Sequence, residues 1–221
     1  MTLALAVLAS LGVALAAPQT AVQAHDTTGP IVVDGRLDEA DWLRHAAQTG
    51  FVRSHPTPGG PHGSTTEVWF LQDETTLYVG MRVTGVEGEI RAHISPREDV
   101  NVDDQLGLYI DPFGDARTGY IFYTNLYGIQ QDMRHAYGEW YIDWDTVWQS
   151  MGRRIEGGFE MEVGIPFRSL QYPETTGDRG VQSQDWTVMV PRKIPAEGVK
   201  LSWPPMKPRY PRIFEQGASL K

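Results

Sequence analysis

The sequence predicts an antiparallel β-sandwich, and three observations support that fold class. Short runs of β-branched and aromatic residues recur at roughly 10–15-residue spacing, about nine in all, which is the rhythm of strands in a sandwich. Turn residues are abundant, with 23 Gly and 15 Pro. Segments with helical periodicity are short and few. A chain of 221 residues is long enough for one sizeable domain.

The elements follow in chain order. Residues 31–33 form a β-branched run that ends at the turn pair Asp34-Gly35. Asp38 is expected to cap a short helix that carries Leu37 and Trp42 on one face. Strands are expected at residues 68–71, 77–83, 106–110, 120–124, 129–133, 147–155, 159–165 and 186–190.

The run from 159 to 165 alternates apolar residues with Glu160 and Glu162. A period of two is typical of a strand with one buried face, so both carboxylates are expected to face solvent. Their spacing does not mark the paired acid and base of a glycosidase.

The N-terminus has the features of an export signal. Residues 1–24 carry no charged side chain, and residues 3–17 form an apolar run that is too short for a comfortable membrane span. Small residues allow cleavage at Ala14-x-Ala16 or at Val22-x-Ala24, and cleavage after Ala24 is preferred. We therefore expect a signal peptide at 1–24, a single domain at 26–205 and an irregular tail at 206–221. The exported protein would be periplasmic, outer-membrane-associated or secreted.

Composition and missing motifs exclude several function classes. The net charge of −9 argues against a nucleic-acid partner, because phosphate binding needs clustered Lys and Arg. The absence of cysteine excludes disulfides, iron–sulfur clusters and a thiol nucleophile. The sequence contains no nucleophile elbow, zinc-protease helix motif or phosphate loop. Catalysis by this domain is not expected.

The stretch from Ile31 to Trp42, IVVDGRLDEADW, resembles the opening of family-9 carbohydrate-binding modules. Similar segments follow in the same order at 66–80, 103–113 and 158–167, so the resemblance covers residues 31–205. The most similar form of the domain lies at the N-terminus of large exported bacterial proteins of uncharacterised function. The resemblance implies an immunoglobulin-like β-sandwich with one short N-terminal helix that binds glycans without chemistry. It also implies a setting in carbohydrate breakdown or uptake, beside a hydrolase of O-glycosyl compounds or an outer-membrane partner.

Sugar binding needs flat aromatic faces together with a few fixed polar groups. The densest aromatic stretch runs from 137 to 148, and it supplies the candidate residues Trp140, Tyr141, Asp143 and Trp144. Trp203, in the Pro-rich C-terminal region, could close over such a site. The alternative for Trp144 and Trp203 is simple packing in the fold, which is the usual fate of large aromatic residues.

Asp99, Asp103 and Asp104 are crowded carboxylates that suggest a calcium site, although the segment fails the EF-hand spacing. The alternative is a set of turn carboxylates. Apart from calcium, no cofactor is expected for the carbohydrate-binding function.

Two other functions remain open. Similar sandwiches bind haem b in extracytoplasmic electron-transfer proteins, and here Met81 or Met151 could pair with His93 or His135. The third hypothesis is an outer-membrane interaction module that binds no sugar.

Overall fold

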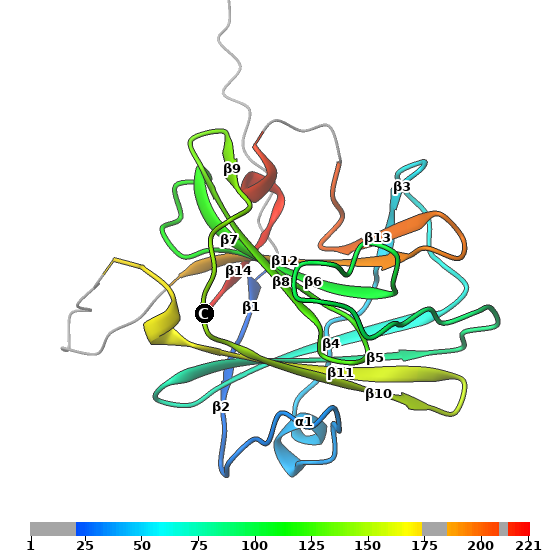
Figure 1. Ribbon diagram of the computed structural model, residues 1–221. Coiled ribbons are helices and arrows are strands. Elements are labelled where there is room, and N and C mark those ends of the chain that lie inside the picture. The colour runs from blue at the N-terminus through cyan, green and yellow to red at the C-terminus, as the bar shows by residue number, and fades with distance from the viewer. Residues whose placement is uncertain (1–20, 174–184, 208–211) are drawn as a thin grey trace, which may run out of the picture.

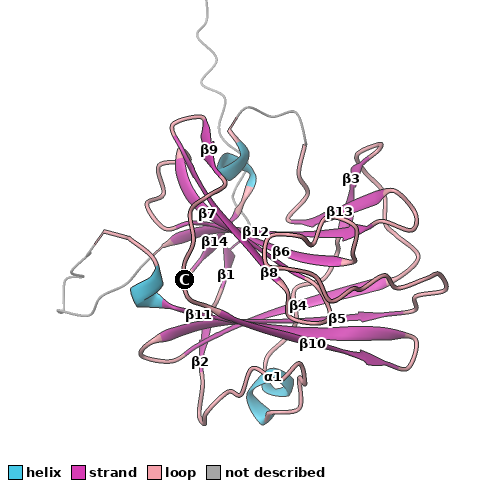
Figure 2. Ribbon diagram, viewed as in Figure 1, coloured by secondary structure: helices cyan, strands magenta, loops and turns pink. Residues whose placement is uncertain are grey.

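The computed structural model describes residues 21–173, 185–207 and 212–221, which form two β-sheets stacked face to face (Figures 1 and 2). The larger sheet contains, in order, β1 (Ala21–Val22), β14 (Ala218–Leu220), β12 (Trp186–Ile194), β6 (Gln105–Asp111), β7 (Thr118–Thr124), β8 (Gln130–Ala136) and β9 (Glu139–Tyr141). Two further strands extend from β12, namely β13 (Val199–Trp203) and then β3 (Val52–His55). The smaller sheet contains β10 (Gln149–Ile155), β11 (Gly158–Pro166), β5 (Thr76–Thr84), β4 (Thr65–Gln72) and β2 (His25–Asp26).

Neighbouring strands of these sheets are antiparallel, apart from the parallel pairs β1–β14 and β2–β4. The helices are short: α1 (Ala40–Arg44), η1 (Phe167–Ser169) and η2 (Ile213–Gln216). The all-β sandwich expected from the sequence is thus confirmed. Among the described residues, no helix has the length and apolar character needed to cross a lipid bilayer.

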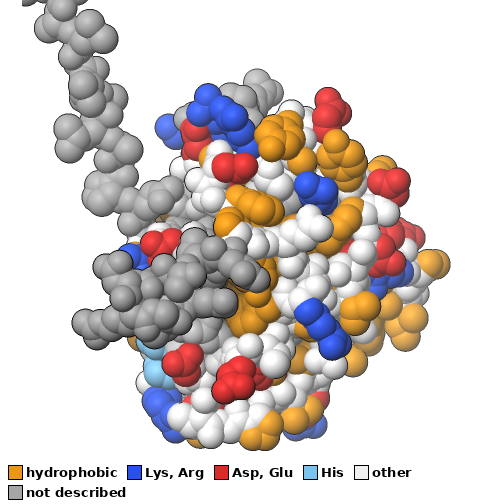
Figure 3. Space-filling view, turned by 90° about the vertical axis from the view of Figure 1, so that its left-hand side faces the viewer, with side chains coloured by type: hydrophobic (Ala, Val, Ile, Leu, Met, Phe, Trp, Pro, Cys, Tyr) orange, Lys and Arg blue, Asp and Glu red, His pale blue; other side chains and the backbone are white. Residues whose placement is uncertain are grey.

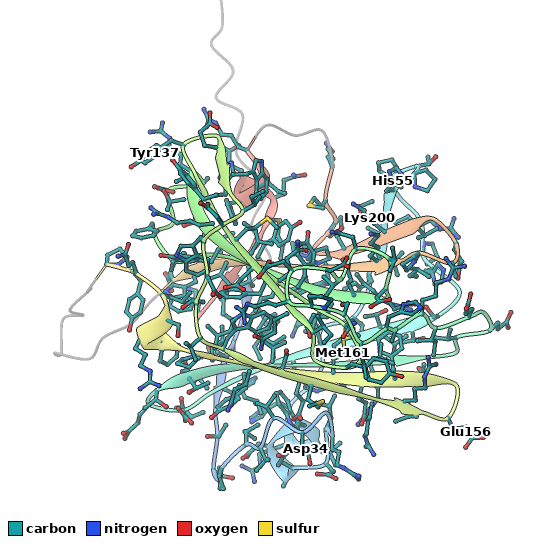
Figure 4. All side chains as sticks on the ribbon, viewed as in Figure 1. Asp34, His55, Tyr137, Glu156, Met161 and Lys200 are labelled. Atoms are coloured by element: carbon teal, nitrogen blue, oxygen red, sulfur yellow. The ribbon has the colours of Figure 1, made fainter. Side chains whose placement is uncertain are left out.

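The main core lies between the two sheets, where alternate residues of each central strand meet. Val163 and Met161 of β11 face Leu108 of β6 and Phe122 of β7 across this layer, and all four are buried. Figure 4 labels Met161, whose side chain sits within the sandwich. The period-two pattern of the sequence therefore corresponds to this inner face.

Part of the outer face of the smaller sheet is also buried, because α1 and the chain before it cover it (Figure 1). Trp42 packs over Gly80 of β5, where a Cβ atom would come within 3.0 Å of the indole. The glycine thus makes room for the ring. The helix begins one residue later than expected, since Glu39 rather than Asp38 is the N-cap and it makes no side-chain capping bond. Residues 31–33 are not a strand.

The prediction that Glu160 and Glu162 face solvent is wrong. Glu162 is 0 % exposed, and its carboxylate accepts hydrogen bonds from the backbone N–H groups of Asp34, Gly35 and Arg36 at 3.0, 2.7 and 3.2 Å. The Trp42 indole N–H donates to its other oxygen at 3.1 Å. The opening motif is therefore fastened to the sheet through one buried carboxylate.

Glu160 is buried as well, but it is neutralised by two cations. Arg82 Nε and Arg153 Nε donate to its two carboxylate oxygens at 2.7 and 2.9 Å. These donors lower the pKa of Glu160 despite its burial. Alternation in the sequence identified the two faces of β11 correctly, but it could not reveal that both faces are covered.

The two ends of the domain differ from the expected boundaries. Within the expected tail, residues 212–221 are not irregular, because η2 packs Phe214 against the larger sheet and β14 joins that sheet beside β12. Ala21 and Val22 pair with β14 in parallel, and Val22 and Ala24 are buried. Cleavage after Ala24 would remove a strand of the fold, whereas the Ala14-x-Ala16 site lies outside the described residues.

Candidate functional site

The candidate aromatic stretch begins with a tight hairpin between β8 and β9. Tyr137 and Gly138 occupy the turn with φ of 51° and 93°, so both have the left-handed backbone that a two-residue hairpin turn favours. Figure 4 labels Tyr137 at the tip of the hairpin, which projects beyond the body of the larger sheet. Figure 3 views the left-hand side of Figure 1, where hydrophobic side chains are interspersed with charged ones. The turn thus places the rings of Trp140 and Tyr141 on β9, at the edge of the larger sheet.

Trp140 lies on the outer face of this hairpin. It pairs across the ribbon with His135, and the two ring centroids are 4.7 Å apart at an interplanar angle of 65°. His135 in turn packs on Phe214 of η2, with centroids 5.9 Å apart. The indole remains 47 % exposed. Trp140 is therefore braced on one side and open to solvent on the other, as a stacking surface requires.

Tyr141 lies on the opposite face of the ribbon, because successive residues of a strand alternate in direction. It pairs with Arg134 and is also 47 % exposed. The two rings do not share one plane, so they cannot form a single flat platform. Each ring instead has its own polar neighbour across the ribbon.

The polar neighbours have free hydrogen-bonding capacity in the described structure. The Nδ1 atom of His135 donates to the Arg117 carbonyl oxygen at 3.2 Å, which leaves Nε2 as the acceptor of the neutral imidazole. Among the described residues, the buried Nε atom of Arg134 has no partner. Trp140 thus lies across the ribbon from an imidazole, and Tyr141 lies across from a guanidinium whose Nε atom is buried without a described partner.

Trp144 packs inward, not toward solvent as a sugar-stacking ring would. It is half-buried, and its ring lies 4.9 Å from Tyr120 and 6.2 Å from Phe122 of the main core. Asp143, just before it, is exposed at the surface. Trp144 therefore fixes the segment that follows β9, and only Asp143 of this pair remains available to a ligand.

Arg97 holds the same segment from outside. Its Nη2 atom forms ion pairs with Asp132 and Asp145 and donates to the Thr146 carbonyl oxygen at 3.1 Å. The aromatic hairpin and the chain beyond it are thus attached to the sandwich at both ends. Arg97 was not singled out by the sequence, because an isolated arginine in a loop carries no pattern.

The prediction that Trp203 belongs to a binding surface is wrong. It pairs with Val190 at the end of β13, is only 5 % exposed and packs 6.1 Å from Phe70 in the main core. Its Pro-rich surroundings suggested a loop, but the backbone continues the larger sheet up to Trp203.

The three candidate calcium ligands are not brought together. The Asp103 carboxylate accepts hydrogen bonds from His93 and from Asn125 Nδ2, both at 2.6 Å, and Asp104 accepts one from the Arg91 backbone N–H at 2.9 Å. Asp99 is exposed. Within residues 21–173, 185–207 and 212–221, no group of three or more His, Cys, Asp or Glu side chains has the arrangement of a metal site. The carboxylates of Asp103 and Asp104 therefore take part in hydrogen bonds within the fold.

The candidate haem ligands are scattered. Met81 is buried in the main core, whereas His135 lies on the outer face of the larger sheet. Met151 belongs to β10 at the edge of the smaller sheet, and His93 is exposed in the loop before β6.

A broad hollow lies beside η2 on the outer face of the larger sheet. Its volume is about 1280 Å³, and its lining includes Phe214, Met206, Lys207 and Asp111. Phe214 also contacts His135, which braces Trp140. The exposed indole is thus connected to this hollow through two packed rings.

Comparison with known proteins identifies the fold. No family profile and no curated protein sequence matches the chain. A family-9 carbohydrate-binding module from Caldicellulosiruptor kristjanssonii in complex with glucose matches with a TM-score of 0.62 and 11 % identity, covering 91 % of this chain and 95 % of that one. The same organism's module in complex with cellotriose matches with a TM-score of 0.60 and 12 % identity, covering 90 % and 93 %.

A third solved structure, from Bacteroides uniformis, is described as a candidate carbohydrate-binding protein. It matches with a TM-score of 0.64 and 14 % identity, covering 92 % of this chain and 99 % of that one. These likenesses extend over nearly the whole described sandwich. In fold, the chain resembles the family-9 carbohydrate-binding modules, as the motif at residues 31–42 predicts.

Proposed function

We propose that this protein is an exported, non-catalytic module that binds a glycan through Trp140 and Tyr141. The observation that carries the proposal is the pair of half-exposed rings on a braced hairpin, each beside a polar side chain. Ring faces stack on the C–H groups of a sugar, and fixed polar groups pair its hydroxyls. The glucose and cellotriose complexes of the two structural relatives support a neutral oligosaccharide as the first ligand to test.

The cellular setting is part of the proposal. The apolar N-terminal run supports export to the periplasm, the outer membrane or the medium. In that compartment a non-catalytic module would hold a polysaccharide near a glycoside hydrolase or an uptake system. The binding surface at the β9 edge lies free of the sandwich core, so a partner domain could sit beside it without disturbing the fold.

The test is isothermal titration calorimetry with cellotriose on the purified protein. Removal of a stacking ring by Trp140→Ala is expected to weaken binding at least about tenfold, which corresponds to 1.4 kcal/mol. Tyr141→Ala is expected to weaken it severalfold. Each variant must keep the wild-type melting temperature, since both rings lie at the surface.

The matched control is Tyr127→Ala. Tyr127 is 48 % exposed, as much as either candidate ring, but it lies in the turn before β8, at the other end of that strand. This variant should bind cellotriose as the wild type does. Equal affinity in all three variants would disprove the site. No binding of any neutral or acidic glycan by the wild type would disprove the function and favour an interaction module.

A further inference from the structure

A second hollow lies at another end of the sandwich, away from the aromatic hairpin. Its volume is about 240 Å³, and the loops before β4 and after β5, together with the end of β12, enclose it. The Val86 backbone N–H donates to the Gly157 carbonyl oxygen at 2.9 Å, which places the hollow near the turn that carries Glu156. In Figure 4, Glu156 and Tyr137 lie at opposite sides of the molecule.

A buried arginine lines this hollow. Arg192 of β12 is 1 % exposed, and its Nη1 atom donates to the hydroxyl oxygens of Ser64 and Thr66 at 2.8 and 3.0 Å. The guanidinium also lies 5.4 Å from the centre of the Phe159 ring. Its Nε atom is buried and has no hydrogen-bond partner among the described residues.

Arg192 lacks a direct counter-charge. Within the described ranges no carboxylate lies within ion-pair distance of its guanidinium, and its hydrogen-bond acceptors are neutral hydroxyls. Asp104 and Glu197 act on it only at longer range, and burial lowers its pKa to about 10. A buried cation without a paired anion is costly. The Arg192 guanidinium at this end of the sandwich therefore lacks a negatively charged group within ion-pair distance.

The rim of the hollow carries side chains of both charges. Glu197 and Glu87 contribute carboxylates, and Arg53 contributes a second cation. His62 is held between its neighbours, with Nε2 at 2.9 Å from Glu197 and Nδ1 at 2.8 Å from the Ser64 hydroxyl. A ligand here meets a cation at depth and hydrogen-bond acceptors nearer the surface.

We propose that this hollow binds one hexuronic acid unit, with its carboxylate on Arg192 and its hydroxyls on the rim. The volume equals that of about eight water molecules, which suits a single sugar ring and not a chain. A carboxylate would satisfy the free Nε atom, and donor hydroxyls would satisfy Glu197 and Glu87. The inference deepens the proposed carbohydrate function, but it uses none of the residues of the aromatic hairpin.

The experiment titrates the protein with three probes: D-glucuronate, D-glucose and acetate. D-glucuronate is expected to bind at least about tenfold more tightly than D-glucose, which has the same ring without the carboxylate. Acetate is expected to bind weakly because it lacks hydroxyls. Equal binding of D-glucuronate and D-glucose overturns the proposal, and equal binding of acetate and D-glucuronate reduces the hollow to a simple anion site and overturns the sugar assignment.

Two variants test the residues. Arg192→Met keeps an apolar stem against Phe159 and removes the charge, so D-glucuronate binding should be lost. If this buried change unfolds the protein, as judged by circular dichroism, the test uses Arg53→Gln at the exposed rim instead. This variant is expected to bind D-glucuronate severalfold more weakly than the wild type. Unchanged affinity in the variant that decides contradicts the proposal. Trp140→Ala should leave D-glucuronate binding intact, which separates this inference from the proposed cellotriose site.

Discussion

Glu162 is the residue on which the N-terminal motif depends. Replacement by alanine leaves three backbone N–H groups and one indole N–H without an acceptor beneath α1. Each lost acceptor for a buried donor costs about 1–3 kcal/mol. We predict that Glu162→Ala lowers the unfolding free energy by at least about 3 kcal/mol in urea titrations. The control Glu156→Ala, in the exposed turn between β10 and β11, should change it little.

The same residue predicts a pH dependence. Burial, helped by the nearby Glu39 carboxylate, raises the pKa of Glu162 from 4.5 to about 7 despite its N–H donors. The folded state therefore binds more protons than the unfolded state between these values. The stabilisation of the folded state by protonated Glu162 is fully present below pH 4.5 and is lost as pH rises through 7.

The measurement is the difference in unfolding free energy between wild type and Glu162→Gln across this range. Taking the difference cancels the titration of the other carboxylates. Relative to Glu162→Gln, the unfolding free energy of the wild type should fall by about 3 kcal/mol between pH 4.5 and a pH above 7. A constant difference would mean that Glu162 is ionised throughout, with its four N–H donors outweighing desolvation.

At the scale of elements, the N-terminal strand decides where an export signal can be cut. β1 pairs with β14, the Ala24 N–H donates to the Lys221 carbonyl oxygen at 2.8 Å, and Val22 is buried. We predict that the protein recovered from a bacterial periplasm begins at Ala17, after the Ala14-x-Ala16 site. Intact-mass spectrometry measures this directly. A mature N-terminus at His25 would show that the fold dispenses with β1.

The strands that the sequence predicts are the longer ones of the fold. Apolar runs between turn residues, with clear alternation only in β11, predict β4 to β8 and β10 to β12 within a few residues of their observed bounds. The sequence does not predict six strands, all of five residues or fewer, namely β1, β2, β3, β9, β13 and β14. Strands of that length rely on neighbours that are distant in sequence, and a local pattern does not report such pairing.

The candidate site was predicted only in part, for a physical reason. Aromatic density located the β9 hairpin, and Trp140 and Tyr141 are indeed exposed there. Exposure itself depends on three-dimensional packing, so Trp144 and Trp203 could not be separated from them by composition. Arg192 gave no sequence signal at all, because its burial follows from the way β12 faces β4.

At the scale of the whole molecule, buried aromatic rings fill the core of the sandwich, and the proposed binding surface lies at its margin. Of the seven tryptophans, which all lie in the described ranges, only Trp140 is exposed, whereas Trp42, Trp69, Trp148, Trp186 and Trp203 are buried and Trp144 is half-buried. A ligand that stacks at the β9 hairpin should therefore disturb one indole and leave the others unchanged. Indole N–H resonances resolve this question residue by residue.

The most direct measurement is a ¹H–¹⁵N titration of the labelled protein with cellotriose, with the Trp140 indole assigned through Trp140→Phe. The account predicts a saturable shift of the Trp140 indole N–H, while the Trp42 indole N–H, held by Glu162, stays in place. Binding seen by calorimetry without movement of the Trp140 resonance would contradict the account.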